Sequence, residues 1–160
     1  MGSLVITPAG SRITRRAALS GAAGLVVTAF AGSVAAQDRT RTIPQPERPG
    51  REAFMERAFE MRRLAVQRGD QPYGAVIVKA DRIVGEGASA VVTDDDPTAH
   101  AEMVAIRDAA RLLGSRDLSS CEMSGTSPAC PMCEAAAYWA RVTRLLHGAA
   151  IVDAGAPRLR

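Results

Sequence analysis

Residues 127–133 read SPACPMC, which places two cysteines three positions apart with a proline directly after the first. Proline is favoured in the first turn of a helix, so the stretch predicts a helix that begins at Pro131. Cysteines at positions i and i+3 share one helix face, and the positive end of the helix dipole favours thiolates there. Taken alone, Cys130 and Cys133 fit half of a metal site, a redox pair or a piece of core.

A second predicted helix start, in residues 96–102 (DPTAHAE), also carries polar groups that suit a metal site. If the two helix starts meet, His100 completes a Cys₂His set, which leaves the fourth position of a tetrahedral zinc ion for water, as in catalytic zinc sites. Glu102 would then move protons to and from that water rather than bind the metal. A purely structural zinc site needs a fourth protein ligand, and only Cys121 and His147 remain to supply it. Cys121 is interpreted as a buried core residue, and His147 as a residue that serves the fold rather than catalysis.

Strands and helices are expected to alternate around these two motifs. Apolar spacing and turn residues predict a helix over 51–68, a hairpin of strands 74–79 and 83–92, a helix after Asp96 that ends at Gly114, a strand over 118–124, a helix from Pro131 to about 141 and a final strand over 145–152. This order predicts an α/β fold with one mixed sheet.

The combination of His100, Glu102 and the Cys130–Cys133 pair resembles the cytidine deaminase-like zinc deaminases, whose signature is H-x-E followed by P-C-x-x-C. The resemblance covers about residues 51–153. It is closest to the guanine deaminase and nucleoside deaminase branch in four runs, 73–76 (YGAV), 96–103 (DPTAHAEM), 130–133 (CPMC) and 137–140 (AYWA).

The resemblance implies a three-layer α/β/α fold with a central mixed sheet, and hydrolytic deamination of a nucleobase or nucleoside, with guanine as the leading candidate. It also implies that His100, Cys130 and Cys133 bind Zn²⁺, that Glu102 is the general acid/base, and that the protein is a homodimer. Tyr73, Ser89 and Trp139 are the expected substrate contacts, Trp139 by shaping the base pocket.

Three departures from the family pattern concern the loop before the cysteines, the substrate contact at Ser89 and the cover of the pocket. Ala129 and Pro128 stand where the family usually has proline and glutamate, and Ser89 replaces a substrate-binding asparagine. An asparagine amide donates and accepts at once, so its loss changes what the site can recognise. The chain also ends at Arg160, soon after the last expected strand, so we expect a C-terminally short fold with an open or partner-completed pocket.

The charge balance argues against a nucleic acid as the main partner. Arg12, Arg15 and Arg16 lie in residues 1–36, which contain no acidic residue. Without these three, the 20 basic residues fall to 17, equal to the 17 acidic residues.

Four alternative functions remain open. They are deamination of adenosine in tRNA or RNA, deamination of cytosine or cytidine, a zinc-stabilised binding protein without turnover, and a redox protein that cycles a Cys130–Cys133 disulfide.

Residues 1–36 resemble a twin-arginine export signal, with Arg15-Arg16 before an Ala/Gly-rich apolar run and small residues at 33–36 for cleavage. An uncleaved membrane anchor is the alternative, but the run is weakly hydrophobic. We therefore expect export to the periplasm or outside the cell, with no membrane span after cleavage. Residues 37–50, which contain three prolines, are expected to be a flexible or extended lead-in to a single zinc deaminase domain over 51–160.

Overall fold

The computed structural model of the protein describes residues 41–159. In chain order, these residues form α2 (Arg51–Gln67), β1 (Gly74–Lys79), β2 (Arg82–Ala88), α3 (Ala101–Leu113), β3 (Cys121–Gly125), α4 (Pro131–Trp139), β4 (Arg144–His147) and β5 (Val152–Gly155). The strands make one sheet in the order β2-β1-β3-β4-β5. The β3–β4 pair is parallel and the other pairs are antiparallel, so the sheet is mixed.

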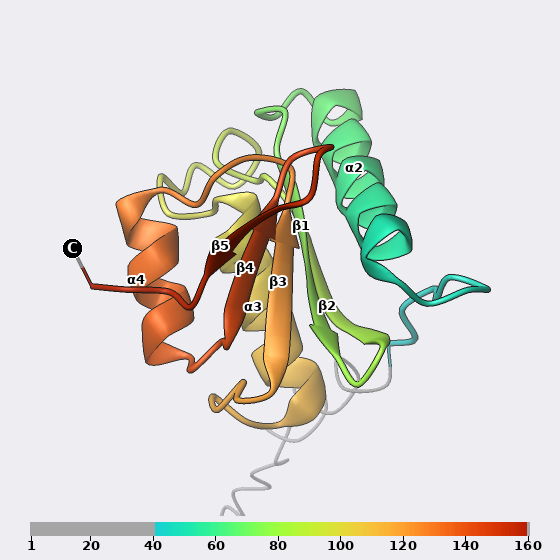
Figure 1. Ribbon diagram of the computed structural model, residues 1–160. Helices are drawn as coiled ribbons and strands as arrows, with labels where there is room; N and C mark the ends of the chain where they lie inside the picture. The colour runs from blue at the N-terminus through green and yellow to red at the C-terminus, as the bar shows by residue number, and fades with distance from the viewer. Residues whose placement is uncertain (1–40, 160) are drawn as a thin grey trace, which may run out of the picture. The chain divides into compact units, whose positions relative to one another are not determined.

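Helices cover both faces of this sheet, with α2 on one face and α3 and α4 on the other (Figure 1). The predicted three-layer α/β/α fold is therefore confirmed. Strand β1 lies inside the sheet and is buried along almost its whole length. Ala75 and Ile77 pack in the cluster shared with α3 and α4, while Val76 and Val78 pack in the cluster shared with α2. An apolar run without polar alternation is what a strand covered on both faces requires.

Two glycines in β2 let α3 lie directly on the sheet. A Cβ atom on Gly87 would come within 2.1 Å of the Ala101 carbonyl oxygen, and one on Gly85 within 2.6 Å of the Ala109 nitrogen. No side chain fits in that space, so the backbone of β2 contacts the backbone of α3. This contact fixes the start of α3, where His100 lies, relative to the sheet.

Several element boundaries differ from the sequence predictions. Strand β2 ends at Ala88, before the predicted 92, because the Asp70 carboxylate accepts hydrogen bonds from the Val92 and Thr93 backbone N–H groups and folds that stretch into turns. The predicted final strand is two antiparallel strands, β4 and β5. Gly148 adopts a left-handed conformation (φ 71°) and accepts a hydrogen bond from the Ile151 N–H, so the apolar run turns back on itself.

The expectation that the folded domain starts at residue 51 is also corrected. Residues 41–50 form no helix or strand, but Ile43 is buried in the cluster beneath α2. The Gln45 side chain donates to the Ile83 carbonyl at 2.9 Å and accepts from the Ile83 N–H at 2.8 Å. These contacts make residues 41–50 part of the fold, as a segment without regular secondary structure that packs against β2.

The predicted export signal, residues 1–36, and the first part of the predicted lead-in lie outside the described residues. Among residues 41–159, no helix is both long and apolar enough to span a membrane.

Candidate active site

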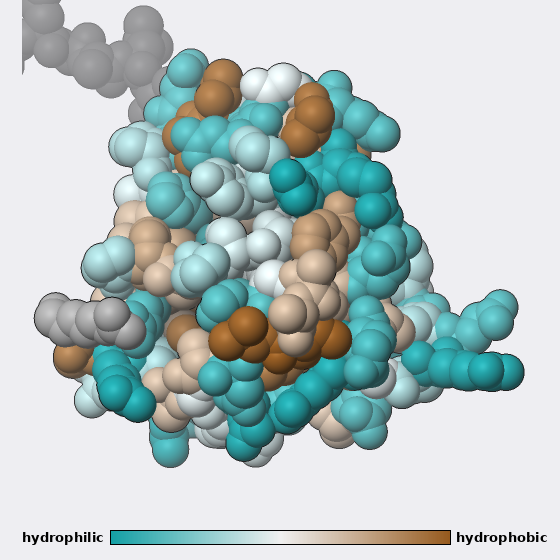
Figure 2. Space-filling model, turned by 45° about the horizontal axis from the view of Figure 1, so that its top comes forward, coloured by the Kyte–Doolittle hydropathy of each residue, from teal (hydrophilic) through white to brown (hydrophobic). Residues whose placement is uncertain are grey.

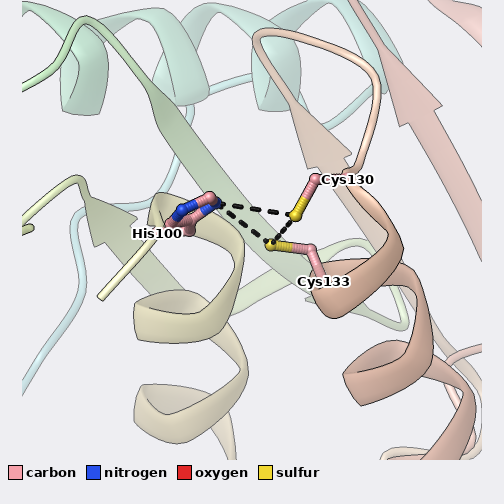
Figure 3. Close-up of side chains that lie close together, drawn as sticks. All are labelled: His100, Cys130 and Cys133. Atoms are coloured by element: carbon pink, nitrogen blue, oxygen red, sulfur yellow. Dashed lines mark hydrogen bonds between the residues drawn. The ribbon is translucent and has the colours of Figure 1, made fainter. Parts of the chain in front are cut away.

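Three metal-binding side chains meet where α3 and α4 begin (Figure 3). His100 is the residue before α3, Cys130 is the residue before α4, and Cys133 lies in the first turn of α4. Both helix starts lie at the upper end of the sheet in Figure 1. The sequence-based expectation that the two helix starts abut is met.

The distances in this cluster suit a tetrahedral zinc ion. The two sulfur atoms are 3.5 Å apart, and His100 Nδ1 lies 3.7 Å from each of them. Ideal bond lengths and tetrahedral angles require roughly 3.8 Å between two sulfurs and roughly 3.6 Å between a sulfur and a nitrogen. All three cysteines are free, and the Cys130–Cys133 separation is far longer than a disulfide bond. The residues present therefore fit zinc, with the fourth corner left to a non-protein ligand.

The Cys133 thiol is fully buried, and its surroundings disfavour a bare thiolate. Burial raises the pKa of this thiol, and the neighbouring Glu102 carboxylate raises it further. A divalent cation that binds here must displace the thiol proton and would then neutralise the sulfur charge, as metal binding to cysteine requires. A free, reactive thiolate is therefore disfavoured at Cys133.

Glu102 lies beside the cluster without joining it. Its residue is 5% exposed, and its Oε2 lies 3.6 Å from Cys133 Sγ. Burial raises the pKa of this carboxyl group, while hydrogen bonds and the nearby His100 oppose the shift. The first turn of α3 brings Glu102 and His100 to the same place although they are only two residues apart. Glu102 therefore borders the candidate metal cluster at Cys133.

Glu102 also lines a cavity of about 230 Å³, and none of the three cluster residues lines it. Its apolar lining includes Met123 from β3 and Leu145 and Leu146 from β4. Its polar groups besides Glu102 are Ser127, Glu134, His147 and Arg158. Sequence reasoning missed Glu134 altogether and took His147 for a structural residue. Only the strand register, which pairs His147 with Gly125 next to Glu102, brings this histidine to the site.

The three predicted substrate contacts, Tyr73, Ser89 and Trp139, do not line this cavity. Ser89 is 2% exposed and its hydroxyl donates to the Asp70 carboxylate at 2.7 Å, so it organises the loop before α3. Tyr73 is 42% exposed and precedes β1, outside the cavity wall.

Trp139 lies near a different set of residues, and its predicted substrate contact stays a prediction. This residue is 72% exposed at the C-terminal end of α4, in a separate surface groove with Arg116 and Arg141. With a rise of about 1.5 Å per residue, it lies about 9 Å along the helix from Cys133 and about 13 Å from Cys130.

Comparison with known proteins agrees with this fold and site. Residues 49–149 match the family model described as the cytidine and deoxycytidylate deaminase zinc-binding region. The chain is 43% identical over 104 residues to the guanine deaminase of Bacillus subtilis, covering 64% of this chain and 67% of that protein. It is 37% identical over 100 residues to the tRNA-specific adenosine deaminase of Aquifex aeolicus, covering 62% of this chain and 66% of that one.

A solved structure has a similar fold. The crystal structure of the B. subtilis guanine deaminase matches with a TM-score of 0.60 at 42% identity, over 62% of this chain and 64% of that one. The fold and the three-residue cluster define a zinc-binding deaminase domain, and the chain belongs to the cytidine and deoxycytidylate deaminase zinc-binding family. The chain spans about two thirds of the length of the relatives it matches.

Proposed function

We propose that this protein is a zinc-dependent aminohydrolase that removes ammonia from an amino-substituted nucleobase, with guanine as the first candidate. The observation that carries the proposal is the placement of Glu102 Oε2 at 3.6 Å from Cys133, at the edge of a cluster whose spacing fits zinc. The similarity to guanine deaminase supports the choice of substrate.

In the proposed reaction, His100, Cys130 and Cys133 hold the ion through one nitrogen and two sulfurs. When bound, zinc lowers the pKa of a water molecule to about 7, so a nucleophile is available at neutral pH. Glu102 accepts the proton of that water and delivers it to the amino group as the C–N bond breaks. Water and the amino-substituted ring thus become a carbonyl-bearing ring and ammonia.

The test is ammonia release by purified, zinc-loaded protein with guanine, cytosine, adenosine and cytidine. Glu102→Gln is the control because it keeps the shape of the side chain and removes its ability to carry the proton. Removing a general acid/base costs typically 10²–10⁴-fold. If the wild type releases no more ammonia than this variant from any heterocycle, the proposal is wrong, and stoichiometric zinc without turnover would favour a non-catalytic binding protein.

Deamination of adenosine in tRNA is the second candidate, because a tRNA-specific adenosine deaminase is 37% identical to the chain. The equal numbers of basic and acidic residues after residue 36 argue against it, since phosphate contacts need positive charge. Including unmodified tRNA among the substrates, and following the conversion of adenosine to inosine, separates the two candidates.

We also propose that the protein is exported. The support is the Arg15-Arg16 pair before an apolar run ending in small residues. Cell fractionation of the full chain and an Arg15→Lys/Arg16→Lys variant tests it, because loss of the arginine pair should leave the protein in the cytoplasm. A homodimer is expected from the family resemblance, and analytical ultracentrifugation would determine it.

A further inference from the structure

Asp70 is a buried carboxylate that belongs to neither of the metal-binding helices. It lies in the loop between α2 and β1 and is 8% exposed. Its Oδ1 accepts hydrogen bonds from the Gln71 backbone N–H and from the Ser89 hydroxyl, both at 2.7 Å. Its Oδ2 accepts from the backbone N–H groups of Val92 and Thr93, at 2.9 and 2.8 Å. Three of the four donors lie in the loop before α3, so this carboxylate joins two loops that are distant in sequence.

The loop before α3, residues 89–99, has little apolar packing of its own. Residues 91–98 are exposed or half-buried and form no helix or strand. The loop leads to the start of α3 at the upper end of the sheet in Figure 1, and Figure 2 turns this end toward the reader, where the surface is mostly hydrophilic with separate hydrophobic patches. The hydrogen bonds to Asp70 are therefore the main contacts that fix the loop, and they also offset the cost of burying its charge.

A short run of backbone contacts connects this fixed loop to His100. Ser89, which donates to Asp70, is followed by Ala90, and the Ala90 N–H donates to the Ala99 carbonyl at 3.0 Å. Ala99 is buried and directly precedes His100. The His100 backbone is extended, and its side chain forms no capping hydrogen bond to α3. The place of His100 therefore depends on the loop on one side and on the contact of α3 with β2 on the other.

From these contacts we infer that Asp70 is a positioning residue of the metal cluster, which sets the place of His100 through the loop between them. His100 Nδ1 lies 3.7 Å from both sulfur atoms, so a shift of the loop would change two of the three distances between ligand atoms at once. A carboxylate that served stability alone would lower the free energy of unfolding without changing the zinc affinity of the folded protein. The inference concerns metal binding and does not depend on which base is deaminated.

The zinc affinity of the full chain, measured by competition with a chelator, tests this. Asp70→Asn keeps the shape of the side chain but replaces one acceptor oxygen with an amino group. We expect it to lower zinc affinity by about 10–100-fold, the range found for residues that hold a ligand in place. Asp117→Asn is the matched control, because Asp117 is a loop carboxylate that accepts the Ser119 backbone N–H at 2.9 Å and lies outside the cluster. It should lower the free energy of unfolding and leave zinc affinity unchanged.

Two further measurements keep the test decisive. Ser89→Ala removes one neutral hydrogen bond to Asp70 and should lower zinc affinity by about two- to tenfold, so the inference stays testable if Asp70→Asn does not fold. The visible absorption of bound Co²⁺ depends on coordination geometry, and it should change in Asp70→Asn but not in Asp117→Asn.

Wild-type zinc affinity and cobalt absorption in folded Asp70→Asn, or in Ser89→Ala, would overturn the inference. An equal loss of zinc affinity in Asp117→Asn would overturn it as well, because the effect would then be one of general stability. No substrate is present in these measurements, so their outcome is separate from the test of deamination.

Discussion

The helices that carry the metal-binding residues begin after loops of contrasting construction. The loop before α3 is held by carboxylates: Asp70 accepts hydrogen bonds from Val92 and Thr93, and Asp96 Oδ1 accepts from the Thr98 backbone N–H at 2.8 Å and hydroxyl at 2.7 Å. The loop before α4 contains Pro128 and Ala129, and within residues 41–159 its residues 127–129 form no side-chain hydrogen bond.

The two loops position their metal-binding residues in different ways. His100 depends on a polar network and on the close approach of β2 to α3, both of which involve residues distant in sequence. The cysteines depend on the helix itself, because spacing of three residues in α4 fixes one sulfur against the other. Substitutions in each region should therefore have different consequences.

The largest effect is expected from Cys133→Ser, which removes the metal-binding thiol in the first turn of α4. Loss of one ligand should lower zinc affinity by more than about 100-fold. Losing a residue that only hydrogen-bonds to a ligand already lowers metal affinity by about 10–100-fold, and losing the ligand itself should cost more. Zinc content by mass spectrometry after dialysis measures this. Cys121→Ser, a buried thiol outside the cluster, should retain stoichiometric zinc, and equal zinc loss in both variants would contradict the assignment of ligands.

Gly87→Ala should be the next most damaging change, now on the α3 side. The added Cβ would lie 2.1 Å from the Ala101 carbonyl oxygen, so α3 must move away from β2. Forced overpacking typically costs about 1–3 kcal/mol of unfolding free energy, measurable by urea denaturation. Gly50→Ala, whose Cβ would meet no atom closer than 3.6 Å, should cost much less, and equal costs would show that the close approach is unimportant.

Asp70→Asn should loosen the loop before α3 and remove a pH-dependent part of the stability. Burial alone would raise the pKa of Asp70, but hydrogen bonds from Thr93, Ser89, Gln71 and Val92 outweigh it and hold the pKa well below its usual range. A lowered folded-state pKa stabilises the protein above the unfolded pKa of about 4, and this contribution is lost as the pH falls further.

Thermal unfolding between pH 2 and pH 7 measures the Asp70 contribution. The wild type should lose stability more steeply below about pH 4 than Asp70→Asn does, and the variant should be less stable at pH 7. Asp81→Asn, in the exposed β1–β2 turn, serves as the control. Parallel curves for wild type and Asp70→Asn would contradict the role assigned to this network.

The smallest effect is expected from Ala129→Pro on the α4 side. Within the described residues the Ala129 N–H donates no backbone hydrogen bond, so proline removes none. Restricting the unfolded chain should stabilise the protein by about 0.4–1 kcal/mol, visible as a small rise in the melting temperature. A loss of stability or of zinc would show that the loop before α4 needs a backbone conformation that proline cannot adopt.

Some of this structure follows from the sequence alone because it depends on neighbours in the chain. The apolar run of β1, the left-handed Gly114 that ends α3, and the proline at the start of α4 are local signals, and each is found where predicted. The Cys130–Cys133 spacing is local as well. His100 and Glu102 could be paired with it only on the condition that the two helix starts meet, and the packing of α3 and α4 meets that condition.

The tertiary structure decided everything that depends on register and on contacts between distant segments. Pairing of β4 with β3 brings His147 beside Glu102, the turn at Gly148 sends β5 and Arg158 back across the cavity, and the length of α4 carries Trp139 away from it. Gln45 likewise joins the fold through Ile83, 38 residues away, and Ile43 through the cluster beneath α2. Spacing in the chain determines which side chains share a helix face, whereas the packing of sheet and helices determines which of those faces meet.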